Sequence, residues 1–295
     1  MSDSPVTLQP GVLAMPRVGE PFGVVDDPPV RVPLAGRVVR GYDVLGTRCA
    51  DERRLFRFRW ILGHQMCFLL WRVLGDVTHR GSGEKPDPRS LELMAACVDG
   101  YSSAMLYAST VPRAHYQIHL RVSMALQHPS FSGAWAADYR PIRWIFRNRA
   151  PWQADGSCPA LARAIARNHV VHDRVADHLV PQGHSLLQES AGHPGTAAPG
   201  EKEDLYDNYF LVIRRPVNRP AFLTQFDSRV GALSADLAAH GFFPEIEGRH
   251  HPIPESETGP TKDLVADALR PLLRARQLMA EERFAEDQIP EDTRR

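Results

Sequence analysis

Histidine is the residue type with the widest choice of chemistry in this sequence, and His64 is the most informative of the thirteen histidines. An imidazole changes charge near neutral pH, so it can accept and return a proton or bind a metal as a neutral base. His64 lies between Leu55 and Val73 in a strongly apolar segment whose single glycine or proline is Gly63. A lone histidine on such a segment is usually a core residue whose nitrogens find partners. The sequence around His64 must therefore decide whether this residue has a catalytic or a structural role.

A second group of candidate histidines lies in the C-terminal half of the chain. One stripe at three-four spacing consists of Leu161, Ile165, Asn168, His172, Val175 and Leu179. The stripe predicts that His172 faces the core and that His169 lies at its edge. The alternative is a surface pair of histidines or a His-x-x-His metal site.

These residues lie in a chain that predicts an all-α protein with a proline-rich, extended N-terminal arm. The arm covers residues 1–45, a single helical domain covers 46–288, and 289–295 form a polar tail. The arm is expected to carry at most a short strand and to pack over the body or over a partner subunit. The helices expected from apolar periodicity cover residues 55–73, 89–110, 114–127, 136–147, 158–180, 204–215, 220–240 and 261–285.

Composition excludes several classes of function. The 35 basic residues balance the 35 acidic residues, so the chain has no general attraction for nucleic acid or for an anionic membrane. No apolar run approaches the roughly 20 residues that span a bilayer, and the N-terminus does not read as a secretory signal. The four cysteines are far apart and form no CxxC motif, which indicates reduced thiols in the cytoplasm and argues against a zinc-thiolate site.

Three ordered blocks resemble the tryptophan 2,3-dioxygenase superfamily of haem enzymes. The string RWILGHQMCFLLW at 59–71 is similar to the family's distal helix, in which a His-Gln pair precedes a Leu-Trp. The string STVP at 109–112, with Tyr116 and Arg121 after it, resembles the Thr-x-Thr-Pro turn and the helix that binds the substrate carboxylate. Ser132-Gly133, followed by Tyr139-Arg140-Pro141-Ile142, resembles the third block. The resemblance implies a helical bundle around haem with His64 on the distal side.

Two departures from the family pattern matter. The glycine-serine loop that closes over tryptophan in the dioxygenases has no counterpart, since the nearest stretch, 195–200, contains a proline and no serine. The step from Tyr116 to Arg121 is also one residue longer than in the family, so His119 is an alternative in the arginine's place. We favour Arg121, because a guanidinium can hold a carboxylate with two hydrogen bonds. A surface arginine on a helix is the structural alternative.

The missing loop makes the chain more similar to the haem-dependent tyrosine hydroxylases of actinobacterial antibiotic pathways, which make L-DOPA for 4-alkyl-L-proline units. That resemblance implies oxidation of L-tyrosine by hydrogen peroxide at the ring carbon ortho to the phenol. His64 would relay a proton, Arg121 and Tyr116 would hold the amino-acid carboxylate, and Trp60, Ser132 and Gly133 would help to form the substrate pocket. The rival interpretations are indole ring opening with O₂, a nonenzymatic haem sensor and a helical scaffold without a cofactor.

The haem contacts are the least determined part of the prediction. His172 is the first choice for the axial iron ligand, His169 the second and His193 the third. The haem is expected to be haem b, held noncovalently, because no cysteine follows Cys158. Arg140 is a candidate cofactor contact, and Arg143, Arg147 and Arg149 are candidate partners for the haem propionates or a solvated basic face. A homodimer or homotetramer is expected.

Overall fold

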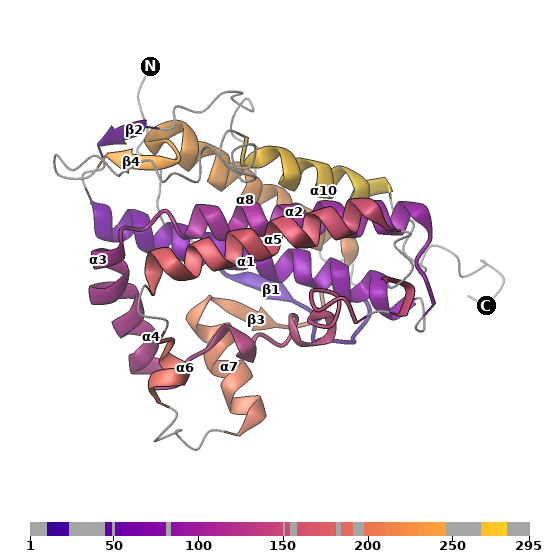
Figure 1. Cartoon of the computed structure of the whole chain (residues 1–295), viewed down its shortest axis with the longest axis horizontal. Helices are drawn as coiled ribbons and strands as arrows, with labels where there is room; N and C mark the ends of the chain where they lie inside the picture. The colour runs from indigo at the N-terminus through magenta and orange to yellow at the C-terminus, as the bar shows by residue number, and fades with distance from the viewer. Residues whose placement is uncertain are drawn as a thin grey trace.

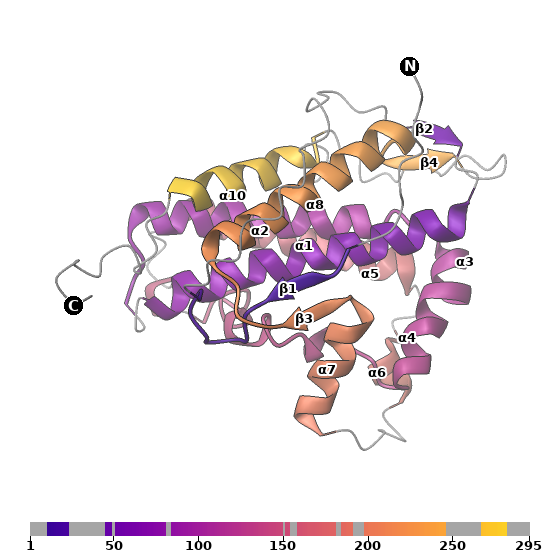
Figure 2. The ribbon, with the colours of Figure 1, turned by 180° about the vertical axis from the view of Figure 1, so that it is seen from behind.

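The protein is helical, as the sequence predicts. The computed structural model describes residues 11–23, 45–48, 51–80, 84–149, 151–153, 158–180, 184–190, 198–245 and 267–281. Three long helices form its centre: α1 (Glu52–Arg80), α2 (Pro88–Ala108) and α5 (Pro159–Leu179). Helix α2 makes extensive contacts with both α1 and α5, and Figure 1 shows the three helices running along the molecule with α5 in front. Figure 2 shows α8 (Arg219–His240) and α10 (Leu269–Glu281) crossing the opposite side.

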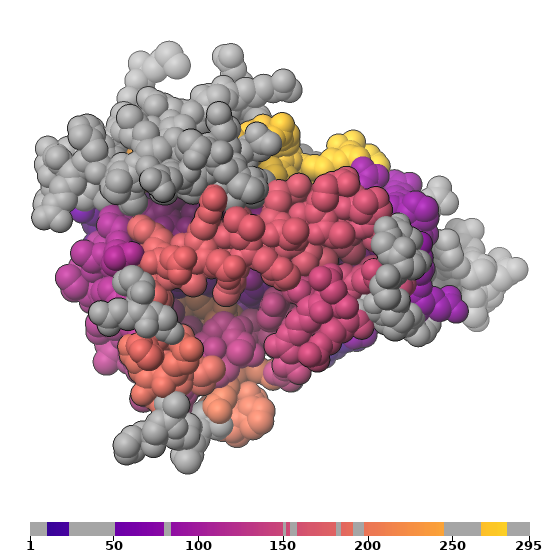
Figure 3. Space-filling model, in the orientation of Figure 1, coloured from indigo at the N-terminus to yellow at the C-terminus, as the bar shows by residue number. Residues whose placement is uncertain are grey.

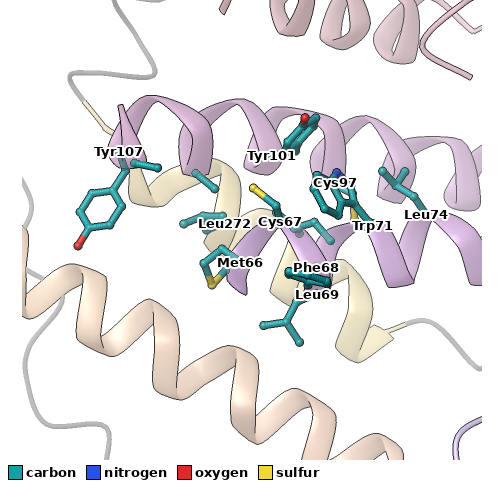
Figure 4. Close-up of a cluster of buried hydrophobic side chains, with 14 of the residues drawn as sticks. Met66, Cys67, Phe68, Leu69, Trp71, Leu74, Cys97, Tyr101, Tyr107 and Leu272 are labelled. Carbon is teal, nitrogen blue, oxygen red and sulfur yellow. The ribbon is translucent and has the colours of Figure 1, made fainter. Parts of the chain in front are cut away.

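Helix α1 is the core element because nearly every residue between 58 and 75 is buried. Met66, Phe68 and Leu69 are fully buried, and Figure 4 shows them packed with Trp71 and with residues of α2 and α10. Gly63, one of two glycines in this helix, permits close packing on α2. A Cβ atom at Gly63 would lie 2.7 Å from the Cβ of Ala108. The apolar segment and its glycine therefore fix the helix pair that positions His64.

A smaller layer of short elements lies beside the bundle. Residues 113–127 leave the bundle as α3 (Arg113–His115), the π-helix η1 (Tyr116–Leu120) and α4 (Arg121–Gln127). Both ribbon views show them next to α6 (Leu186–Glu189) and α7 (Pro199–Tyr209). Three 3-10 turns complete this layer: η2 (Gly133–Trp135), η3 (Arg140–Ile142) and η4 (Pro151–Gln153).

Four short strands join distant parts of the chain. β1 (Leu13–Met15) pairs in parallel with β3 (Val212–Arg214), and Leu13 lies opposite Val212. β2 (Leu45–Arg48) pairs in parallel with β4 (Phe243–Glu245). The short strand allowed for in the N-terminal arm is therefore present. It packs on the body of the same chain, because all three residues of β1 are buried.

Two expected helices are wrong. Residues 136–147 form turns and η3 in place of a helix, because Pro141 lacks an N–H and interrupts the backbone pairing. The helix expected over 204–215 starts earlier, at Pro199, and ends at Tyr209. The chain then reverses at Leu211, whose φ is 58°, and enters β3. Within the described residues, no helix is both long and apolar enough to span a membrane.

Candidate active site

His64 is the exception in an otherwise buried stretch of helix. Every residue of α1 from 58 to 75 is buried except His64, which is partly exposed. A helix surrounded by protein has an accessible position only where it borders an opening. The space-filling view in Figure 3 shows a hollow below α5, with α6 and α7 on its other side. His64 is therefore the residue through which the buried helix can contact a bound molecule.

The His64 imidazole is held in its neutral form. Its Nδ1 lies 2.7 Å from the carbonyl oxygen of Trp60, so Nδ1 carries the hydrogen and donates it. Burial disfavours the imidazolium and lowers the pKa of His64 from 6.5 to about 4, although the hydrogen bond to Trp60 opposes this shift. The lone pair then lies on Nε2, for which no hydrogen bond occurs within the described residues. His64 thus presents a neutral nitrogen base at the end of a fixed ring.

Aromatic side chains hold that ring in place. The His64 ring stacks on Phe210 with a centroid distance of 4.1 Å and an interplanar angle of 10°. Trp60 packs on it with a centroid distance of 4.4 Å. Behind Phe210 lie Phe131 and Tyr206, whose rings stack at 5.5 Å. None of these three residues is predicted from the sequence, because Phe210 and Tyr206 belong to a region without a recognised motif.

The neighbour of His64 in the His-Gln pair has a structural role. Gln65 is fully buried and donates its amide N–H groups to the carbonyl oxygens of Gly11 and Phe210, both at 2.9 Å. Its Oε1 accepts a hydrogen bond from the buried Arg229. Gln65 therefore joins α1 to the N-terminal segment, to α8 and to the residue that stacks on His64. The pair combines one residue that borders the opening with one that fixes its surroundings.

The π-helix explains the extra residue between Tyr116 and Arg121. In η1 the N–H of Arg121 donates to the carbonyl oxygen of Tyr116, five residues earlier. A π-turn absorbs one inserted residue and keeps the flanking residues on the same side of the helix. The Arg121 guanidinium lies close enough to Tyr116 to oppose the rise that burial causes in the pKa of its phenol, and the centroid of the Tyr116 ring lies 5.5 Å from that of Trp60. The structure thus brings Arg121 to Tyr116, whereas His119 packs against His115.

Arg121 is buried but its charge is already paired. Its Nη2 donates to the carbonyl oxygen of His184 at 2.9 Å and lies 2.7 Å from Oε1 of Glu189 on α6. The resemblance implies that this guanidinium binds a carboxylate, and in the structure it holds one that belongs to the chain itself. Arg121, Tyr116 and Trp60 form a continuous series of contacts that ends at His64.

The third sequence block lies one layer further from His64. The Ser132 hydroxyl accepts a hydrogen bond from the N–H of Ala134 and starts η2, while Gly133 is exposed. Arg140 is half exposed and pairs with Glu203 of α7. These contacts attach the segment to α7, so Ser132, Gly133 and Arg140 support the aromatic wall in this structure.

The orientation expected for His172 is wrong. Its side chain is 66% exposed, and its Nδ1 lies 3.9 Å from the carboxylate of Asp173. His169 is also exposed, and its Nε2 lies 2.9 Å from the carbonyl oxygen of Phe146. The buried face of α5 passes through Val171 instead. His193, the third choice, lies outside the described residues.

Other candidate contacts lie at the surface. Arg143, Arg147 and Arg149 are exposed, and the first two lie near Tyr139, where their charges oppose the rise that burial causes in the pKa of that phenol. In the described part of the chain, no group of three or more His, Cys, Asp or Glu side chains could hold a metal ion. A metal ion bound by these described residues would therefore need further ligands that are not protein side chains, such as those of a porphyrin.

The comparisons with known proteins agree with the sequence resemblance. Residues 16–157 match the family model described as SfmD 3-methyl-L-tyrosine peroxygenase. This part of the chain, just under half of its length, is similar to that peroxygenase family. The matched region contains α1, α2, the π-helix and the turn at Ser132, and thus all three blocks identified from the sequence. No curated protein matches the chain significantly.

The residues around His64 fit a haem in the way that a peroxygenase of this family would require. Aromatic rings pack around the His64 ring, and the free Nε2 of His64 is a base suited to the distal side of a haem. The side chains of Tyr101 and Tyr206 are also buried, and burial raises the pKa of both phenols. These features are those expected of the distal side of a haem site, whereas neither His172 nor His169, the described candidates for the axial ligand, faces inward.

Proposed function

We propose that this protein is a haem-dependent peroxygenase that hydroxylates L-tyrosine at the ring carbon ortho to the phenol. The reaction converts L-tyrosine and hydrogen peroxide to L-DOPA and water, in the biosynthesis of a 4-alkyl-L-proline antibiotic. The family match supports peroxide-driven hydroxylation of a tyrosine-type substrate. The observation that carries the proposal is the free Nε2 of the neutral His64, the single accessible position in a buried stretch of helix.

His64 acts as the proton relay. A histidine-ligated haem supplies the iron that activates peroxide. The Nε2 lone pair of His64 accepts the proton of one peroxide oxygen and returns it to the oxygen that leaves as water. The hydrogen bond from Nδ1 to Trp60 keeps the ring in the tautomer that this transfer needs. The low pKa of about 4 keeps His64 unprotonated before peroxide binds.

Arg121 and Tyr116 orient the substrate. The guanidinium binds the amino-acid carboxylate, as it binds a carboxylate of the chain in this structure. Tyr116 and Trp60 extend from this charge toward His64, so a phenol ring that packs along them reaches the base. Fixing the two ends of the substrate determines which ring carbon meets the oxidant.

The absorption spectrum and the products test this proposal. The purified protein should show a Soret band, and peroxide with L-tyrosine should yield L-DOPA. A protein without a Soret band would refute the haem assignment. Turnover of 3-methyl-L-tyrosine with L-tyrosine left intact would overturn the substrate assignment but keep the peroxygenase. Formation of N-formylkynurenine from tryptophan and O₂, without tyrosine turnover, would identify a dioxygenase.

Histidine variants separate the distal role from the axial role. His64→Ala should retain haem and lose turnover by about a hundredfold or more, the usual contribution of a general acid–base. Loss of the Soret band in this variant would instead make His64 the iron ligand, a role that its hydrogen-bonded Nδ1 also permits. His172→Ala, His169→Ala and His193→Ala should be compared in parallel. The variant that loses haem identifies the axial ligand, and retention by His172→Ala would refute the first choice made from the sequence.

A further inference from the structure

Arg121 and Glu189 form a pair of opposite charges at the end of the series of contacts from His64. The Arg121 side chain is 10% exposed and that of Glu189 is 53% exposed, with Nη2 and Oε1 2.7 Å apart. The same Nη2 also donates to the carbonyl oxygen of His184. The buried cation is thus positioned by the protein, while the anion lies on the accessible side.

The chain presents Glu189 in a defined position. α6 is a single helical turn closed by a capping box, in which the Ser185 hydroxyl accepts from the N–H of Gln188 and the Gln188 side chain accepts from the N–H of Ser185. The N–H of Glu189 donates to the carbonyl oxygen of Ser185 at 2.9 Å. The turn is attached to α4 through Arg121, so the backbone of Glu189 is held near the guanidinium while its carboxylate can turn.

We propose that Glu189 binds the α-ammonium group of the substrate while Arg121 binds its carboxylate. This inference rests on the proposed function, in which the substrate is an amino acid. The two charged groups of an amino acid are attached to one carbon, and Arg121 and Glu189 offer complementary charges side by side. The Glu189 carboxylate turns from the guanidinium to the ammonium as the substrate carboxylate takes its place.

Charge balance favours a substrate that binds both Arg121 and Glu189 over one that only displaces Glu189 from Arg121. A substrate with only a carboxylate would bring a second anion to Arg121 and leave Glu189 beside it without a cation, which is unfavourable. A zwitterion provides a partner for each charge. Glu189 thereby selects amino acids over phenolic acids that lack the ammonium group.

The test compares binding of two ligands without peroxide. The haem-loaded wild type and its Glu189→Gln variant are titrated by calorimetry with L-tyrosine and with 3-(4-hydroxyphenyl)propanoate, the analogue without the amino group. L-Tyrosine should bind the variant at least about tenfold more weakly, the usual effect of losing a charged hydrogen bond. The analogue should bind it as well as, or better than, the wild type. Glu92→Gln is the matched control, because Glu92 is also 53% exposed and pairs with one arginine, Arg274 of α10.

The other outcomes contradict the inference in distinct ways. Equal tightening of both ligands in Glu189→Gln would show that Glu189 merely competes for Arg121. Unchanged binding of L-tyrosine would show that Glu189 does not contact the substrate, and would leave the proposed function intact. If the wild type binds neither L-tyrosine nor 3-methyl-L-tyrosine, the proposed function and this inference both fail.

Discussion

Helices α1 and α5 each contain a histidine that the sequence analysis assigned to haem, and they differ in how those histidines are placed. In α1 every residue from 58 to 75 is buried except His64, which is partly exposed. In α5 one face packs on α2 and the other is exposed, and His172 lies on the exposed face. A histidine in a fully buried helix is restricted to a few environments, whereas a histidine on an amphipathic helix can point either way.

The two histidines differ because the sequence patterns of α1 and α5 constrain the direction of a side chain to different degrees. The spacing in α5 permitted a stripe through His172, but the buried face runs through Asn168 and Val171. Both 171 and 172 satisfy three-four spacing from Asn168, and burial of the apolar Val171 is more favourable than burial of an imidazole. Side-chain polarity therefore decides which of the two adjacent residues, Val171 or His172, faces the core.

The two helices are also anchored differently. Arg59 of α1 lies 2.8 Å from Asp236 of α8, and both side chains are fully buried. Arg59 also donates to the carbonyl oxygens of Gly241 and Phe242. In α5 the corresponding contact is Arg167 with Asp99 of α2, which is partly exposed to solvent. Substitutions of these anchors measure how far the two helices differ.

The largest effect is expected for Asp236→Asn. This change leaves the Arg59 guanidinium buried without a counterion, which usually costs about 3–5 kcal/mol. It also weakens the hydrogen bond that the Tyr107 hydroxyl donates to Asp236. Urea unfolding should show the loss as a lower midpoint. A loss below about 1 kcal/mol would show that α1 does not depend on this buried pair, and Tyr107→Phe is the control for the hydrogen bond alone.

Acid should destabilise the protein through His64, with an intermediate effect. The folded-state pKa of about 4 lies below the value of 6.5 for the free side chain, so the unfolded chain binds more protons between these pH values. Stability is therefore fully present above pH 6.5 and decreases as the pH falls toward 4, by roughly 2–3 kcal/mol. His64→Phe should flatten the profile of unfolding free energy over this window. His115, whose pKa burial also lowers to about 4, accounts for part of the remaining slope. An unchanged slope in His64→Phe would contradict the neutral state assigned to His64.

The sequence predicts the long helices and fails where the chain turns, while the distal role of His64 stays a prediction. The apolar run around His64 and the Asp87 cap with Pro88 are local signals, and they place α1 and α2 within a few residues. The reversal at Leu211 depends on parallel pairing between β1 and β3, which lie about 200 residues apart and carry no local signature. Phe210 was missed for the same reason, since its role comes from contacts with His64 and Gln65.

The smallest effect is expected for Asp99→Asn, the anchor of α5. Arg167 donates to both carboxylate oxygens of Asp99, at 2.8 and 2.6 Å. Burial raises the pKa of Asp99 and the Arg167 charge opposes this rise, so the pair gains little beyond its desolvation cost. Because solvent reaches both side chains, the loss should be about 1 kcal/mol or less by urea unfolding. A loss equal to that of Asp236→Asn would mean that α5 is held as firmly as α1. The contrast between the two helices would then lie in the orientation of their histidines alone.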